Sequence, residues 1–383
     1  MTLQSNFPIP FNRADLLGSE LENIKAAVTS GQIAGDHGFT RKCEALLQEQ
    51  LRVHRCLLTT SCTHALEMSA LLLELKPGDE VIIPSFTFVS TATAFALRGA
   101  TPIFADIRPD TLNIDEGQIE SLITPRTKAI VPVHYAGVSC EMDTLISIAE
   151  RHNLTVVEDN AHGLFGRYKG QALGTFGALA TQSFHATKNF SCGEGGALLI
   201  NDPKFAERAE ILREKGTDRS KFFRGEVDKY SWVDIGSSYV PSDLLAAYLL
   251  AQLELRDRIQ TARRKIWDNY QQGLARWAAE QDIRLPHVPT DCEPAWHLFY
   301  LLLPDPETRE ALRLHLRSKG ILAVSHYVPL HSSRYGSRWG ASPHSCPVTD
   351  RTAETLLRLP FYNSMTYAEQ NEVIGAVTSF HTS

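Results

Sequence analysis

The chain has 383 residues, of which 43% are hydrophobic and 21% are charged. These values are ordinary for a globular protein and argue against a disordered, collagen-like or coiled-coil chain. Lysine and arginine number 38 against 44 aspartate and glutamate residues, which gives a formal net charge of -6. A protein whose main task is to bind nucleic acid would usually carry a basic excess, so a nucleic-acid partner is not expected.

Three features predict a cytoplasmic enzyme without a membrane partner. Residues 1–6 lack the basic stretch and apolar run of a secretory signal. The longest apolar run, residues 244–251, is too short to cross a bilayer. The seven cysteines are odd in number and form no CxxC pair, which favours reduced thiols over a disulfide framework or a zinc module. The histidines also lack metal-ligand spacing, so no metal site is expected.

Short apolar runs alternate with segments of helical spacing through the first half of the chain. Gly193, Gly195 and Gly196 mark a tight loop before a further strand at 197–200. This alternation is typical of a mostly parallel sheet with helices on both faces, so the predicted fold class is α/β. The other expected strands lie at 56–59, 81–83, 102–106, 129–133 and 154–157, and the helices lie at 65–73, 90–98 and 143–151.

The second half of the chain predicts longer helices and a smaller unit. Residues 205–215 and 309–319 are expected to be helices, 243–279 are expected to be helical almost throughout, and 296–303 are expected to form a strand. A chain of this length usually forms more than one domain. We therefore expect a large domain at 15–255, a smaller C-terminal α+β domain at 256–383 and an N-terminal arm at 1–14.

Polar residues that follow strands are the first candidates for a site, because ligands of open α/β sheets bind beyond the carboxyl ends of the strands. Lys188 follows the strand-like run 178–184 and precedes the glycine-rich loop. A lysine in that place can be a Schiff-base nucleophile. On the lysine alone, a solvated surface residue is the commoner case.

Asp159 follows the apolar strand 154–157, with Glu158 beside it. A carboxylate at the end of a buried strand can face the pyridine nitrogen of pyridoxal phosphate (PLP). There it keeps the nitrogen protonated and makes the ring an electron sink. A helix cap or a structural ion pair explains this residue equally well.

Weaker signals lie near these two residues. Ser61 has the place of an N-cap, and the free N–H groups of the helical turn after it could hold a phosphate. A capped helix without a ligand is the commoner case. Phe88 follows a strand and could stack on a flat ring, although an aromatic residue there is more often part of the core.

Taken in chain order, these segments resemble the DegT/DnrJ/EryC1/StrS family of nucleotide-sugar aminotransferases. The resemblance spans nearly the whole chain. It implies a PLP-dependent enzyme of aminotransferase fold type I, with a large, mostly parallel sheet domain of the seven-stranded type and a smaller C-terminal α+β domain. The segments that carry the resemblance are 31–39, 77–82, 157–159, 183–189, 241–243, 326–331 and 359–362.

The resemblance implies roles for residues that match the family pattern. Lys188 would be the catalytic lysine that bonds the cofactor, and Asp159 would face the ring nitrogen. His162, where many members have Gln, would lie near the phenolic oxygen of the ring. Phe88 would stack on the ring.

The resemblance also implies a phosphate site at Cys62, Thr63 and Ser183, the first two chiefly through their backbones. Cys62 stands where the family usually has Gly. Its side chain lies where the backbone would approach the phosphate closely, and it could alter that approach. Ser238 stands where many members have an Asn that reaches the phosphate from the neighbouring subunit. Both departures from the family pattern fall on the phosphate site.

The implied activity is transfer of an amino group from L-glutamate to the C4 keto group of dTDP-4-keto-6-deoxy-D-glucose, carried out by a homodimer. His326, Tyr327 and His134 are candidate substrate contacts. The charged segment 216–230 is a candidate loop that contacts the nucleotide or the partner subunit. A mobile surface loop explains that segment equally well.

Other functions are consistent with parts of the pattern. The closest is a member of the same family that acts on another nucleotide keto sugar, such as one forming the gluco epimer or one carried on UDP. A PLP-dependent sugar dehydratase is disfavoured, because by resemblance those enzymes replace Lys188 with His. A non-catalytic PLP-binding regulatory protein would usually add a DNA-binding module, and no such module is evident. A nicotinamide-dependent oxidoreductase is disfavoured because no GxGxxG follows the first strand.

Overall fold

The fold is built around one seven-stranded sheet in a computed structural model that describes residues 7–340 and 344–381. The first six residues of the expected arm, on which the absence of a secretory signal was judged, lie outside these ranges. The strand order is β1-β9-β8-β5-β4-β2-β3, and only β9 runs against the others. This confirms the mostly parallel α/β sheet. The strands are β1 (Arg55–Thr59), β2 (Glu80–Pro84), β3 (Thr101–Ala105), β4 (Thr127–Ile130), β5 (Thr155–Asp159), β8 (Leu179–Ser183) and β9 (Gly196–Ile200).

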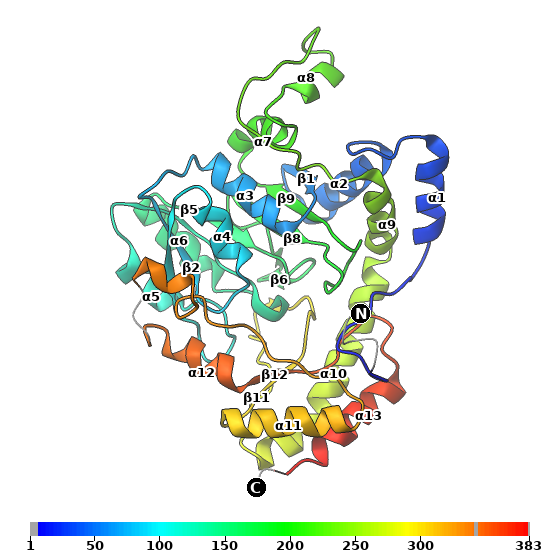
Figure 1. The fold of residues 1–383 in the computed structure, drawn as a ribbon, viewed down its shortest axis with the longest axis vertical. Coiled ribbons are helices and arrows are strands. Elements are labelled where there is room, and N and C mark those ends of the chain that lie inside the picture. Colours follow the sequence, from blue (N-terminus) through cyan, green and yellow to red (C-terminus); the bar gives the residue numbers. More distant parts are fainter. Residues whose placement is uncertain (1–6, 341–343, 382–383) are drawn as a thin grey trace.

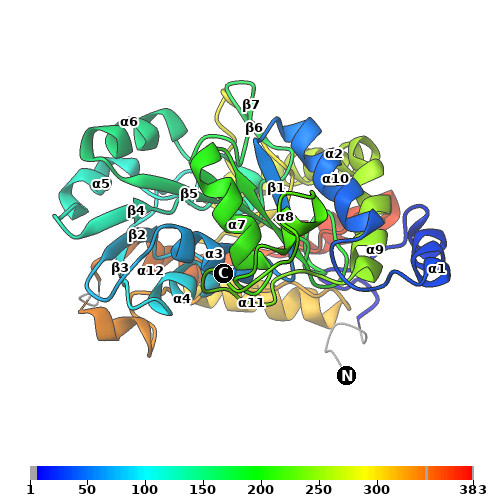
Figure 2. The same ribbon diagram turned by 90° about the horizontal axis from the view of Figure 1, so that it is seen from above.

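Helices cover both faces of this sheet, as predicted (Figure 2). Successive side chains of a strand point to opposite faces. In β2, Val81 and Ile83 therefore pack with α3 (Cys62–Leu72) and α4 (Ser90–Ala96), whereas Ile82 packs with α5 (Glu116–Leu122) and α6 (Met142–His152). The strands are apolar on both sides because neither face is open to water.

The remaining elements of the sheet domain surround this core. A three-stranded sheet joins β10 to β6 and β7. In Figure 1, α8 stands clear of the rest at the top. The bounds of these elements are α1 (Glu20–Ser30), α2 (Gly38–Leu51), β6 (Arg167–Tyr168), β7 (Gln171–Ala172), α7 (Ala206–Arg213), α8 (Arg219–Phe223), α9 (Asp243–Glu254) and β10 (Cys292–Glu293).

A second apolar cluster lies at the other end of the molecule, at the bottom of Figure 1. It joins α10 (Arg256–Glu280), α11 (Pro306–Ser318) and α13 (Tyr367–Thr378) to a two-stranded sheet of β11 (Tyr300–Leu302) and β12 (Leu356–Arg358). Helix α12 (Pro347–Thr355) precedes β12. The expected helix 243–279 is interrupted at Leu255, between α9 and α10. The domain boundary near residue 255 stays a prediction, and the helix break falls at that place.

Two expected elements are shorter than their sequence pattern suggests. The strand expected at 296–303 is reduced to β11, because Trp296 has a left-handed φ of 53° and His297 donates its backbone N–H to Ala136. The strand expected at 129–133 ends at Ile130, after which Val133 forms only an isolated bridge to Asp159. Both departures occur where the chain turns towards the carboxyl edge of the sheet. None of the helices in the described ranges is long and apolar enough to span a bilayer.

Candidate active site

The predicted site residues come from several segments that meet at one edge of the sheet. Asp159 and Ser183 are the last residues of the neighbouring strands β5 and β8. Lys188 lies in the loop from β8 to β9, and Cys62 begins α3 directly after β1. Since β9 runs in the opposite direction, its first residue, Gly196, also lies at this edge, paired with Ser183. Parallel strands thus bring together residues far apart in sequence.

Asp159 is buried and its carboxylate is held by two donors. Thr91 donates from Oγ1 to Oδ2 at 2.7 Å, and the backbone N–H of Ala161 donates to Oδ1 at 3.2 Å. Burial raises the pKa of the Asp159 carboxyl, while these hydrogen bonds and the charge of Lys188 act against the rise. The carboxylate is fixed in position and is suited to a cationic partner.

The loop that carries Lys188 is fixed at both ends by backbone hydrogen bonds. Phe184 donates its N–H to Gly195, and Ala186 donates its N–H to Gly193 at 2.9 Å. Asn12 from the N-terminal arm donates its side-chain amide to the Ala186 carbonyl at 3.0 Å. Burial lowers the pKa of Lys188 to about 8, although the Asp159 carboxylate favours its protonation. A minor fraction of this amine is therefore neutral near physiological pH, far more than for an exposed lysine, and the neutral form is the one that a nucleophile requires.

The N-terminus of α3 is pressed closely against the start of β9. Ser61 caps the helix by accepting the His64 N–H at 3.1 Å. A Cβ atom added at Gly196 would lie 2.3 Å from the carbonyl carbon of Ser61, so only glycine fits there. The Cys62 thiol donates to Thr181 at 3.5 Å, which turns the side chain away from the free backbone N–H groups of the helix. A phosphate can bind at such a terminus through backbone donors and the helix dipole.

Aromatic and imidazole rings form one wall of the site. His162 stacks on His297 with ring centroids 4.1 Å apart, and His326 is nearly parallel to His162 at 6.3 Å. The hydroxyl of Tyr327 lies 3.5 Å from Nε2 of His162, and the hydroxyl of Tyr135 lies 2.9 Å from Nδ1 of His326. Burial lowers the pKa of all three histidines well below the usual value, so the imidazoles are neutral.

One atom of this wall has an open hydrogen-bonding position. Nδ1 of His162 is buried and has no partner within the described part of the chain. Buried polar atoms in native proteins usually find a partner, so this atom indicates a ligand group that the protein itself does not supply. It fits the expected contact of His162 with the phenolic oxygen of a cofactor ring.

Three predicted site residues have different surroundings from these. His134 is fully buried, and both ring nitrogens are used, one by Glu158 at 3.0 Å and the other by the Cys140 N–H at 3.2 Å. The expected substrate contact at His134 therefore has no free polar atom, and the residue instead supports β5. Phe88 is 57% exposed, with its ring 6.5 Å from that of Tyr327. Ser238 is exposed and pairs with Glu214.

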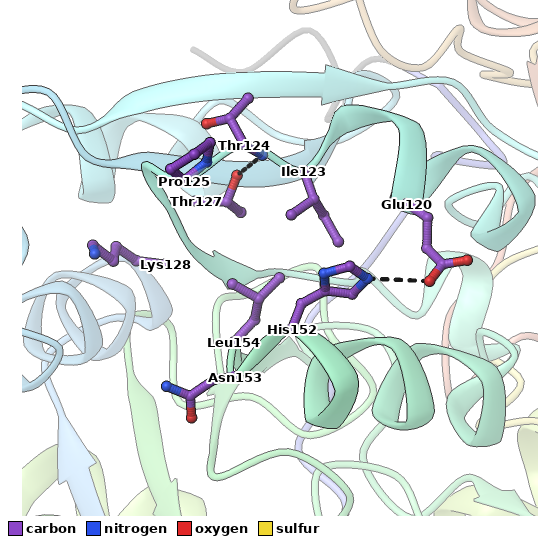
Figure 3. Close-up of a pocket in the computed structure, with 9 residues that line it drawn as sticks. All are labelled: Glu120, Ile123, Thr124, Pro125, Thr127, Lys128, His152, Asn153 and Leu154. Atoms are coloured by element: carbon purple, nitrogen blue, oxygen red, sulfur yellow. Dashed lines mark hydrogen bonds and ion pairs between the residues drawn. The ribbon is translucent and has the colours of Figure 1, made fainter.

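Figure 3 shows a different, open cavity of about 570 Å³ near the amino ends of β4 and β5. His152 contacts Glu120 across it at 3.1 Å. None of the predicted site residues lines this cavity. The convergence of polar side chains at the carboxyl edge, rather than the size of a cavity, locates the site. The lining residues are Glu120, Ile123, Thr124, Pro125, Thr127, Lys128, His152, Asn153 and Leu154.

Residues 15–378 match the DegT/DnrJ/EryC1/StrS aminotransferase family. The chain belongs to this family. Similar solved structures include the aminotransferase TlmJ from Streptoalloteichus hindustanus, at 31% identity and a TM-score of 0.88, and DesV from S. venezuelae in complex with a ketimine intermediate, at 32% and 0.88. The sugar aminotransferase Spr1654 from Streptococcus pneumoniae, solved in a PLP-form, is 27% identical with a TM-score of 0.89. Each comparison covers 97% of this chain and 98% of the other chain.

The enzyme is thus an aminotransferase with the fold of PLP-dependent sugar aminotransferases of fold type I. PLP is the cofactor of this family, and the residues at the carboxyl edge fit it. The Lys188 amine can bond its aldehyde, Asp159 can pair with its ring nitrogen, and the N-terminus of α3 can hold its phosphate. The unpartnered Nδ1 of His162 can form a hydrogen bond with a further polar group on the ring.

Sequence reasoning missed several residues that shape this site. Thr91 supports Asp159, and His297 and Tyr135 complete the ring wall. Arg358, at the end of β12, places a positive charge that acts on Lys188 and His162. Tyr135 follows the expected strand 129–133 but was given no role. Thr91, His297 and Arg358 follow no strand of the main sheet directly, so the rule of polar residues at strand ends could not find them.

Proposed function

We propose that this aminotransferase uses PLP to transfer an amino group from L-glutamate to the C4 keto group of dTDP-4-keto-6-deoxy-D-glucose. The products are dTDP-4-amino-4,6-dideoxy-D-galactose and 2-oxoglutarate. The observation that carries the proposal is that a partly neutral Lys188 amine and the buried Asp159 carboxylate lie at one edge of the sheet, close enough for each charge to act on the pKa of the other. An aminotransferase can use the two groups together, the lysine at the aldehyde of PLP and the carboxylate at its ring nitrogen.

The sugar substrate is proposed from sequence resemblance within the family. Segments 132–138, 140–143, 213–217, 222–225 and 234–239 resemble dTDP-4-amino-4,6-dideoxygalactose transaminase, which makes a precursor of enterobacterial common antigen. Both departures at the phosphate site, Cys62 and Ser238, fit the same subgroup. The chain would therefore act in the supply of an amino sugar for a surface polysaccharide.

The roles of the residues follow from their chemistry. When bound, PLP supplies an aldehyde that bonds amines and a protonated ring that withdraws electrons from the carbon that loses its proton. Lys188 would hold the resting cofactor, and its freed amine would take a proton from Cα of the donor and pass it, as an acid, to the carbon of the cofactor that carried the aldehyde. Asp159 keeps the ring nitrogen protonated. Neutral His162 and Tyr327 orient the polar edge of the ring.

Two half-reactions share this site in turn. In the first, the donor would leave its amino group on the cofactor and depart as the keto acid, with water supplying the keto oxygen. In the second, the same residues act in reverse order on the keto sugar. Ping-pong kinetics is therefore expected.

The exposed position of Ser238 suits a contact with a second copy of the chain, and we propose a homodimer. Segment 216–230 carries α8 away from the rest of the molecule and exposes Phe223 at 56%. An exposed aromatic residue on a projecting segment suits an interface with the partner subunit or the nucleotide. All seven cysteines are free thiols, which suits work in the cytoplasm.

An assay with L-glutamate and dTDP-4-keto-6-deoxyglucose, followed by NMR of the product, tests the proposal. An axial amine at C4 supports the galacto product. An equatorial amine, or activity only with a UDP-linked sugar, would support the alternative of another nucleotide keto sugar. A protein that is yellow and gains mass at Lys188 with borohydride, but turns over no keto sugar, would support a non-catalytic PLP-binding regulator.

A further inference from the structure

His297 is a buried histidine of the ring wall to which the proposed reaction gives no role. Its ring stacks on that of His162, with the centroids 4.1 Å apart and the planes 25° apart. Its Nδ1 lies 2.8 Å from Oδ1 of Asn189, the residue that follows Lys188 in the chain. One side chain therefore contacts both the imidazole with the open hydrogen-bonding position and the segment that carries the reacting amine.

The Asn189 amide fixes the place of the proton on His297. Nδ2 of Asn189 lies 2.6 Å from the Ala295 carbonyl, which can only accept a hydrogen bond, so this nitrogen is the donor. The amide oxygen then faces Nδ1 of His297 and can only accept. Burial lowers the pKa of His297 well below the usual value, so the ring is neutral. It carries its one proton on Nδ1.

The backbone that presents His297 is strained and is held by one buried arginine. Trp296 has a left-handed φ of 53°, which a bulky residue rarely adopts, and such strain is common at functional sites. Arg263 of α10 donates to the carbonyls of Trp296 and His297. It also donates to Oδ1 of Asn363 at 2.7 Å, and Nδ2 of Asn363 donates to the Asn189 carbonyl at 3.0 Å. Arg263 therefore holds both partners of the His297–Asn189 hydrogen bond to one helix.

We propose that His297 is a positioning residue for the reaction. Its Nδ1–H holds Asn189 and so limits the movement of Lys188. Its ring face fixes the plane of His162, whose unpartnered Nδ1 is the atom suited to the polar edge of the cofactor ring. A misplacement of about 1 Å in a reacting group can cost roughly 100-fold in rate. The inference rests on the proposed roles of Lys188 and His162 and names the side chain that joins them.

Two variants separate the two contacts of His297. His297→Asn keeps an amide N–H near the place of Nδ1 but removes the ring, whereas His297→Phe keeps a ring that can stack but removes the donor. His315→Asn and His315→Phe are the matched controls. His315 of α11 also uses one ring nitrogen for a backbone carbonyl, that of Ala376 at 3.0 Å, and packs on the ring of Phe380.

The first readout is the acetylation midpoint of Lys188 in the cofactor-free enzyme. His297→Phe frees Asn189, which lets water reach Lys188, so the midpoint should rise from about 8 by at least about 0.5 pH unit. The charged groups that act on Lys188, Asp159 and Arg358 among them, are the same in all variants. His297→Asn and the controls should keep the wild-type midpoint. An unchanged midpoint in His297→Phe, or equal shifts in both His297 variants, would overturn the contact with Asn189 as a positioning contact.

The second readout is the pH dependence of the absorbance of the bound cofactor, which reports on the polar edge of its ring. The midpoint should shift by at least about 0.5 pH unit in His297→Asn, because His162 loses the ring that fixes its plane, and should stay in His297→Phe. In both variants kcat should fall at least roughly 10-fold, while the KM for L-glutamate stays within about twofold. An unchanged kcat would overturn the proposal.

Nitrogen-15 NMR of the histidine rings in the wild-type enzyme gives a test that needs no variant to fold. A proton on Nδ1 of His297 supports the link to Asn189, and a proton on Nε2 would overturn it. If borohydride adds mass at a lysine other than Lys188, the proposed function fails. The acetylation and NMR measurements on the cofactor-free enzyme would still decide whether His297 holds the segment of Lys188.

Discussion

The hydroxyl of Thr91 donates a 2.7 Å hydrogen bond to Oδ2 of Asp159, joining two residues 68 positions apart. Thr91 lies in α4, and Asp159 is the last residue of β5. The bond favours the ionised form of a carboxylate whose pKa is raised by burial. The helix on one face of the sheet therefore contributes to keeping the carboxylate at the end of β5 charged.

Replacement of Thr91 by Val should move the acid limb of the pH profile upward. The hydrogen bond lowers the pKa of Asp159, so its loss raises that pKa and the carboxylate is protonated at higher pH. A shift of about 0.5 to 1 pH unit is expected from a bond with a net worth of about 1 kcal/mol. The measurement is kcat/KM for L-glutamate against pH. Thr93→Val, on the exposed side of the same helix, is the control, and equal shifts in both variants would contradict the role of Thr91.

The Lys188 amine should titrate near pH 8 in the cofactor-free enzyme. Burial lowers its pKa to about 8, and a lysine is nucleophilic only above its pKa, when it has lost its proton. Acetylation at a series of pH values, followed by peptide mass spectrometry, measures the midpoint. Exposed Lys128 serves as the reference for reagent reactivity.

The same titration in Asp159→Asn should give a lower midpoint for Lys188. The Asp159 carboxylate favours the ammonium form, so its removal makes the proton easier to lose. A midpoint that rises, or one that does not move, would show that the two side chains do not face one another across the site.

Gly196→Ala should weaken both the fold and cofactor binding. The new Cβ would lie 2.3 Å from the Ser61 carbonyl carbon and 2.4 Å from the Cys62 nitrogen, and neither backbone atom can move without shifting α3. We expect a loss of about 2 kcal/mol in the free energy of unfolding, as for other overpacked sites. Denaturant unfolding and a PLP titration test this. Gly375→Ala in α13, where nothing lies within 4 Å of the added atom, should lose no stability.

The sheet and the two residues with the strongest candidate roles could be predicted from sequence because each signal is local. An apolar strand followed by Asp159, and a strand followed by a loop with Lys188, are continuous segments. Because the strands of a parallel sheet run in one direction, their carboxyl ends lie at one edge whatever the order of the strands. The short antiparallel β9 was found as a strand for the same reason, since its apolar run is unbroken.

The rest of the site depends on contacts that no local pattern encodes. His162 and His297 stack although 135 positions separate them, and Arg358 reaches the site from the C-terminal sheet. His134 was a candidate substrate contact, yet its side chain is fully buried. A strand end fixes where a residue lies along the sheet, whereas the direction of its side chain depends on the neighbouring elements that pack against it.

Glu158 and Asp159 are adjacent in β5, and replacing each carboxylate by an amide should affect a different property, stability for Glu158 and turnover for Asp159. Glu158 is fully buried and accepts hydrogen bonds from the backbone N–H groups of Gly174, Phe176 and Gly177 and from His134. In Glu158→Gln, the two N–H groups of the amide would face backbone N–H groups that donate to the carboxylate in the wild type. We expect Glu158→Gln to lose about 3 kcal/mol of stability, because buried donors are left unsatisfied.

Asp159→Asn should instead keep its stability within about 1 kcal/mol, because the Ala161 N–H can still donate to the amide oxygen while the Thr91 hydroxyl can accept from the amide nitrogen. Turnover should fall at least roughly 100-fold, since a neutral amide does not hold the ring nitrogen protonated. Denaturant unfolding of the cofactor-free variants and steady-state rates of the loaded ones measure the two effects separately. Similar stability losses in both variants would contradict the division of roles, because β5 would then use both carboxylates to hold the fold.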